Sequence, residues 1–110
     1  MTDALIVFCT CENEQQARRL ATDLVERRLA ACVNILPGMH SIYRWQGRVE
    51  NAEEVLLLIK TTESTFAALA HQIHELHSYE TPEIVGIAIS NADGNYLDWL
   101  RQQVQPGSAS

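Results

Sequence analysis

The sequence predicts one α+β domain in which four strands and three helices follow one another in the order βαββαβα. Two observations predict this class: short apolar runs of strand length are separated by longer segments whose apolar residues recur at helical spacing. The chain has 110 residues, the usual size of a single domain, and its 46% hydrophobic content is enough for one core. We therefore expect a single domain over residues 1–110, with residues 106–110 as a disordered tail.

The first strand and the first helix follow from the hydrophobic pattern. Residues 4–10 are apolar on both alternating faces, as expected for a central strand that is covered on each side. From Glu14 onward the period becomes that of a helix, and Arg27 and Arg28 suit the negative end of its dipole. The apolar residues that define this helix are Ala17, Leu20, Ala21 and Leu24.

The middle of the chain predicts an unusually long hairpin. Residues 31–36 have strand character, which is interrupted at Pro37-Gly38 and resumes over residues 41–45. A turn is expected at Gln46-Gly47, and the returning strand has its core at residues 55–59. We therefore expect an aromatic-tipped arm whose outer half projects beyond the sheet.

The last part of the chain predicts a helix, a strand and a further helix. Thr62 or Ser64 can cap the first of these helices, which ends near Ser78. After a loop, residues 84–89 form a strand that is again apolar on both faces. Turn residues with a helix cap then precede a short helix over residues 96–104.

This order is that of a ferredoxin-like sandwich, in which two helices cover one face of an antiparallel sheet. The other face is also apolar, since the strands place Leu56, Leu58, Val85, Ile87 and Ile89 there. Leaving five such side chains in water would forfeit about 10 kcal/mol, which is comparable to the whole stability of a domain. The sequence therefore predicts self-association, the alternative being a monomer whose last helix folds back over this face.

Composition excludes several classes of partner. The net charge of −6 and the pI near 5.0 oppose binding to nucleic acid.

The longest apolar run, residues 4–9, is far shorter than the roughly 20 residues needed to cross a membrane. We expect no secretory signal, because Asp3 precedes this run and no basic segment does. Three cysteines cannot all pair internally, so reduced thiols and a cytoplasmic location are expected.

Cysteines and histidines are the candidate metal ligands. Cys9 and Cys11 are two residues apart on a strand and so share a face, where they either present two soft ligands or pack as small apolar groups. Three histidines recur every third residue on the second helix, namely His71, His74 and His77. They are either metal ligands or exposed helix residues, with one histidine at the helix end. No nucleophile with a base, and no carboxylate pair, is indicated by spacing, so a binding protein is favoured over an enzyme.

Several motifs resemble the CutA divalent-cation-tolerance family over about residues 4–104. They are Leu29-Ala30-Ala31-Cys32-Val33-Asn34, Pro37-Gly38, Ser41-Ile42-Tyr43-Arg44-Trp45-Gln46-Gly47, Glu54, Lys60-Thr61, His77-Ser78-Tyr79-Glu80-Thr81-Pro82-Glu83 and Tyr96-Leu97-Asp98-Trp99-Leu100. The resemblance implies a cytoplasmic homotrimer of ferredoxin-like protomers, similar to the PII signalling proteins, which binds copper or other divalent cations such as zinc.

The resemblance also implies site residues. Cys9 and His77 match the positions of a copper site assigned in some family members, whereas Leu76 stands where that site has a second histidine. Cys11 and His74 are possible auxiliary ligands.

The alternative function is a PII-like regulatory or scaffold trimer that binds a small molecule or a partner protein in clefts between its subunits. Charged groups beside aromatic rings are typical of such pockets. The candidate cleft residues are Trp45, Glu54, Lys60, Tyr79 and Glu83.

Overall fold

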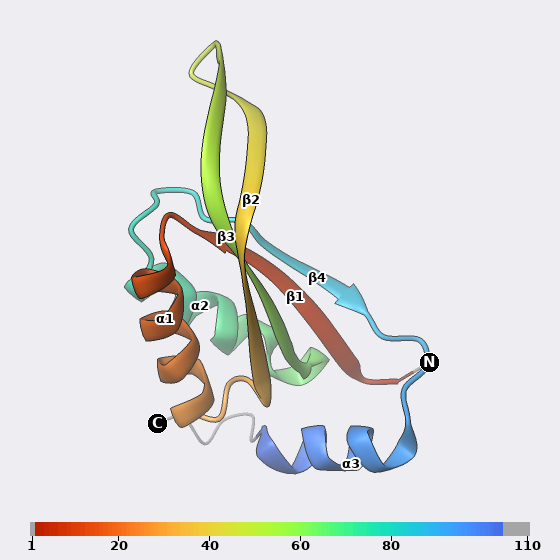
Figure 1. The fold of residues 1–110 in the computed structure, drawn as a ribbon. Coiled ribbons are helices and arrows are strands. Elements are labelled where there is room, and N and C mark those ends of the chain that lie inside the picture. The colour runs from red at the N-terminus through yellow and green to blue at the C-terminus, as the bar shows by residue number, and fades with distance from the viewer. Residues whose placement is uncertain (1, 105–110) are drawn as a thin grey trace.

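The computed structural model describes residues 2–104 as a four-stranded antiparallel sheet with three α-helices, so the predicted tail at 106–110 lies outside the described residues (Figure 1). The elements are β1 (Ala4–Cys11), α1 (Glu14–Glu26), β2 (Cys32–Trp45), β3 (Arg48–Thr62), a 3₁₀ turn (Glu63–Thr65), α2 (Phe66–Leu76), β4 (Ile84–Ala88) and α3 (Gly94–Gln103). This confirms the predicted α+β class and the predicted order of elements.

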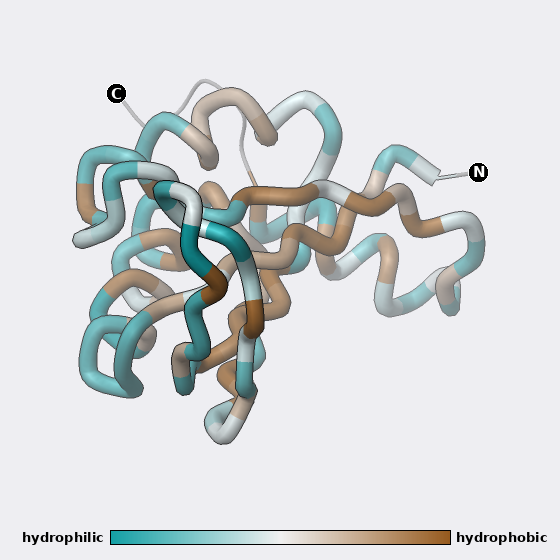
Figure 2. Tube along the Cα trace, turned by 90° about the horizontal axis from the view of Figure 1, so that it is seen from above, coloured by the Kyte–Doolittle hydropathy of each residue, from teal (hydrophilic) through white to brown (hydrophobic). Residues whose placement is uncertain are grey.

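The strands lie in the order β2-β3-β1-β4, and every neighbouring pair is antiparallel. The main core lies on one face of this sheet, where α1 and α2 pack together. From the sheet it takes the alternate residues Val7, Cys9, Leu57 and Ile59, all of which are fully buried. Figure 2 shows that the most hydrophobic stretches follow the strands through the middle of the molecule. The period-two pattern of β1 and β3 therefore aims one row of side chains at the helices.

The opposite face of the sheet, here called the open face, carries a second apolar set. Phe8 on β1 lies opposite Leu58 on β3 and Val85 on β4, so one apolar row crosses three strands. Val85 and Ile87 remain 48% and 47% exposed in the single chain. Helix α3 covers only one end of this face, where it packs in a small cluster and leaves Val85 and Ile87 partly exposed. That cluster contains Ala4, Ala31, Leu100 and Val104.

The hairpin formed by β2 and β3 is long, as predicted, and its outer half projects from the sheet (Figure 1). The expected interruption at Pro37-Gly38 does not end the strand; it produces a shift in register between Leu36 and Met39. Gly38 has φ +83°, a conformation that glycine adopts without steric cost. A bulge of this kind lets the strand bend and continue, which is why β2 is longer than its hydrophobic pattern indicated.

Two helix boundaries differ from the prediction. Neither Thr62 nor Ser64 caps α2, which begins at Phe66 after the 3₁₀ turn without a side-chain cap. The Thr62 hydroxyl instead forms a 2.7 Å hydrogen bond with the hydroxyl of Thr65. Helix α3 begins at Gly94, earlier than expected, because the Asp93 carboxylate accepts the first free backbone N–H groups.

Replacing Asp93 with alanine is expected to lower the free energy of unfolding by about 1 kcal/mol, since two backbone donors of α3 lose their acceptor. Urea titration at one fixed protein concentration measures the change. Asp93→Asn keeps an oxygen at the same place and should lose much less. Equal losses in the two variants would contradict the capping role.

Candidate functional site

Two of the candidate metal ligands come from the end of β1. Cys9 and Cys11 share the face of the sheet that the helices cover, as the alternation predicted, and both are fully buried. Their neighbours across the strand pair are Leu57 and Val55. Both thiols therefore lie in an apolar environment at the upper edge of the core, and both are free cysteines.

His77 lies at the C-terminal end of α2 and reaches the same strand end. Its Nε2 donates a 2.7 Å hydrogen bond to the carbonyl oxygen of Thr10 and lies 3.9 Å from Cys11 Sγ. Its Nδ1 accepts a 3.0 Å hydrogen bond from the backbone N–H of Tyr79. These partners fix the neutral ring with its proton on Nε2, because Nδ1 must accept. Both ring nitrogens are thus already engaged.

The three groups influence one another's ionisation. The neighbouring Cys11 thiol and burial raise the pKa of Cys9 far above its ordinary value. Cys9 in turn lowers the pKa of Cys11 to about 6, helped by His77 and opposed by burial. Burial lowers the pKa of His77, but the hydrogen bonds to Cys11 and Thr10 outweigh it, so this pKa is raised. The proton of the thiol pair therefore stays on Cys9, and Cys11 is the sulfur with thiolate character.

The structure brings His77 to Cys11, which sequence reasoning placed only as an auxiliary ligand. The other auxiliary candidate, His74, is exposed on α2, and His71 faces Glu75 at 3.5 Å. Leu76, where the resemblance has a histidine, is 43% exposed. Within residues 2–104, no three side chains of His, Cys, Asp or Glu converge as a metal site.

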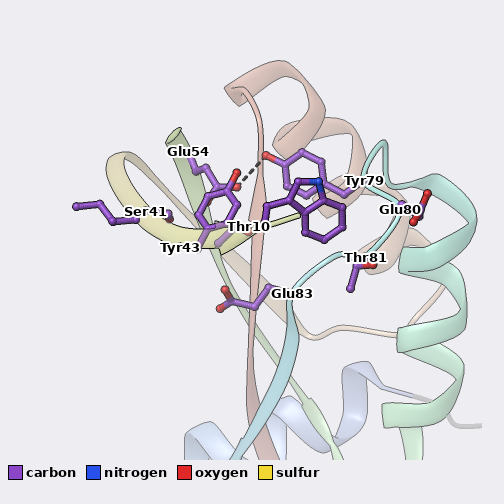
Figure 3. A pocket seen from close by; sticks show the side chains of 10 residues that line it. Thr10, Ser41, Tyr43, Glu54, Tyr79, Glu80, Thr81 and Glu83 are labelled. Atoms are coloured by element: carbon purple, nitrogen blue, oxygen red, sulfur yellow. Dashed lines mark hydrogen bonds between the residues drawn. The ribbon is translucent and has the colours of Figure 1, made fainter. Parts of the chain in front are cut away.

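A cavity of about 610 Å³ opens on the other side of β1 (Figure 3). It is formed by the outer half of the hairpin, the end of β1 and the loop between α2 and β4. Four of the predicted cleft residues line it: Trp45, Glu54, Tyr79 and Glu83. Lys60 does not; its ammonium donates to the side-chain oxygen of Asn34 on β2, away from the cavity.

Glu54 and Tyr79 form the polar centre of this cavity. The Tyr79 hydroxyl donates a 2.8 Å hydrogen bond to Glu54 Oε2, drawn as a dashed line in Figure 3. Burial and the Glu54 carboxylate raise the pKa of Tyr79, so the phenol stays protonated and remains a donor. The ring of Tyr79 also packs against that of His77 in a tilted arrangement, with centroids 4.7 Å apart. Tyr79 therefore touches both the cavity and the cysteine–histidine pair.

Tyr43 also lines the cavity. Several further lining residues were not predicted, namely Thr10, Ser41, Ile42, Glu80 and Thr81. Thr10 could have been found, because strand alternation places it opposite Cys9 and Cys11, and its neighbour in the pairing is Leu56. Tyr96 and Trp99 pack against each other on α3 with tilted rings, outside the cavity.

No helix within residues 2–104 is long and apolar enough to cross a membrane.

The comparisons with known proteins agree on one family. The family model described as CutA1 divalent ion tolerance protein matches residues 5–103. A divalent-cation tolerance protein CutA from Thermus thermophilus is 52% identical over 88% of this chain and 94% of its own. Protein CutA from Homo sapiens is 42% identical over 94% of this chain and 58% of its own. The family model and the Thermus relative are named for divalent-cation tolerance and not for an enzymatic activity.

Solved structures agree with the sequence comparison. The Cut A1 structure from Thermus thermophilus superposes with a TM-score of 0.91 at 49% identity, covering 93% of this chain and 99% of its own. The CutA structure from Xylella fastidiosa gives 0.92 at 38% identity, with 94% and 100% coverage. The motifs, the sheet order and these matches together place the chain in the CutA1 divalent ion tolerance protein family.

Proposed function

We propose that this protein acts in tolerance of divalent cations as a non-catalytic homotrimer that binds copper through Cys11 and His77, with Cys9 as a further ligand. Membership of the family supports the role in cation tolerance. The observation that carries the metal proposal is the 3.9 Å approach of Cys11 Sγ to His77 Nε2. Thiolate and imidazole are donors that copper and zinc both accept.

The donor set fits a metal with one rearrangement. Cys11 and His77 would hold the ion, because their donor atoms lie close enough to bind the same metal. His77 Nε2 must first release the carbonyl of Thr10 and its own proton. Cys9 shares the face of Cys11 and would supply a third donor, which favours Cu(I) because that ion accepts soft sulfur ligands.

A competition titration with a chromogenic Cu(I) chelator, under reducing conditions, tests the proposal. Cys11→Ser is expected to weaken binding at least tenfold, and a Cys9→Ser, His77→Ala double variant should lose tight binding. Cys32→Ser is the matched control, since this third free cysteine lies on β2 outside the group. Affinity no tighter than micromolar in the unaltered protein, or equal losses in all three variants, would contradict the metal site.

The trimer is supported by the open face of the sheet. Its row of Phe8, Leu58 and Val85 and the neighbouring Ile87 are apolar, and α3 leaves them uncovered. Covering one such side chain contributes about 1.5–3 kcal/mol, so copies of the chain gain by packing these faces together.

The cavity supports a second candidate function, a regulatory or scaffold trimer that binds a small molecule or a partner protein. Its volume of about 610 Å³ is within the range of small-molecule sites. Thermal unfolding in the presence of a metabolite panel tests this candidate, because a ligand at 100 times its dissociation constant adds about 2.7 kcal/mol. Unchanged melting across a broad panel would count against it.

We place the protein in the cytoplasm, where its three free cysteines stay reduced. One solved relative, from Archaeoglobus fulgidus, is described as a periplasmic divalent cation tolerance protein. Fractionation of the source cells with compartment markers decides between the two locations for this chain; recovery outside the cytoplasmic fraction would overturn the placement.

A further inference from the structure

We infer that the cavity between the hairpin and the α2–β4 loop binds a small organic cation, an aliphatic ammonium compound. The inference deepens the second candidate function, on which it rests, by naming the chemical class of the ligand. It uses the side of β1 opposite Cys9 and Cys11, although Tyr79 contacts both the cavity and His77.

The charged side chains that line the cavity are all negative. Three of its lining residues are glutamates, namely Glu54, Glu80 and Glu83, and none is a lysine, arginine or histidine. Among the described residues, no ion pair involves any of the three. A cation that enters therefore meets uncompensated negative charge.

Glu54 differs from an ordinary surface glutamate. It is only 8% exposed, and its Oε2 is held by the Tyr79 hydroxyl. Glu54 lines the cavity, and within residues 2–104 its other carboxylate oxygen, Oε1, has no hydrogen-bond partner. A carboxylate buried to this degree gains most from a cation, because desolvation strengthens the attraction.

The other walls favour an organic cation over a metal ion. Tyr43, Trp45 and Tyr79 line the cavity, and Figure 3 shows the two tyrosine rings beside Glu54. Ring faces attract ammonium groups, and Trp45 and Tyr43 have 43% and 44% of their surface free. The glutamates do not converge as a metal-binding group in the described chain, and the cavity is far larger than a bare ion requires. Aromatic walls with buried negative charge are the features of ammonium recognition.

Tryptophan fluorescence of the protein tests the inference with putrescine as the probe. Trp45 and Trp99 are the only tryptophans, so a Trp99→Phe background makes Trp45 a reporter of the cavity alone. We expect a saturable change with putrescine at constant ionic strength and none with 1,4-butanediol, the uncharged molecule of the same length. Absence of a saturable change at millimolar putrescine, or an equal response to butanediol, overturns the inference.

Charge-removing variants in the same background locate the ligand. Glu54→Gln keeps an oxygen to accept from Tyr79 and should weaken putrescine binding about tenfold or more, as should Glu83→Gln. Glu75→Gln is the control, because this exposed glutamate lies on α2 beside His71. Equal affinity in Glu54→Gln and Glu75→Gln overturns the inference, as does Mg²⁺ binding that excludes putrescine. Such a failure would leave the copper titration of Cys11 variants and the search for other ligands unaffected.

Discussion

Val85→Asp is expected to convert the proposed trimer into monomers of 12.4 kDa. Val85 lies beside Phe8 and in the apolar row that continues to Leu58, and almost half of its surface is free in the single chain. In the trimer, this position would be buried against another copy, where an unpaired carboxylate costs several kcal/mol. Light scattering coupled to gel filtration at micromolar concentration measures the mass.

Val25→Asp is the matched control for this experiment. Val25 is 42% exposed, close to the value for Val85, but it lies on α1, on the side of the sheet away from the open face. The control should keep the mass of the unaltered protein. A Val85→Asp variant that also keeps this mass would contradict the role of the open face, and dissociation of both variants would show that the charge acts through general instability.

Leu57→Ala is expected to lower the free energy of unfolding by about 2–5 kcal/mol, through lost burial and the cavity left behind. Leu57 is fully buried and lies between Cys9 on β1 and Ile35 on β2. Urea titration at one fixed chain concentration measures the loss, because unfolding of an oligomer depends on concentration. Val25→Ala should change stability by less than about 0.5 kcal/mol. A loss below about 1 kcal/mol at Leu57 would contradict its place in the core.

The fold could be predicted because the spacing of apolar residues in the sequence matches the helices and strands of the structure. Residues 4–10 appear as a central strand with Val7 and Cys9 on one face and Phe8 on the other. The hairpin followed from two strand-like segments and from Gln46-Gly47, which both adopt positive φ in the turn. The start of α2 was missed because local capping signals at Thr62 and Ser64 were overridden by a 3₁₀ turn and a bond between threonines.

The site was only partly predictable, because its parts are distant in sequence. Alternation placed Cys9 and Cys11 on one face, but the position of His77 beside Cys11 depends on how α2 ends and the next loop turns back. That loop also brings Tyr79 to Glu54, a contact between residues 25 positions apart. Lys60 shares its face of β3 with Glu54, yet it lies several residues farther along the strand and binds Asn34 instead. Local sequence patterns do not indicate such contacts between residues that are distant in the chain.

The mass of the unaltered protein in solution tests the central claim, that an apolar sheet face is covered by further copies of the chain. Sedimentation equilibrium at micromolar concentration should return about three times 12.4 kDa, with no monomer at the lowest concentration measured. A single species of 12.4 kDa would contradict the claim, because Val85 and Ile87 would then remain in water.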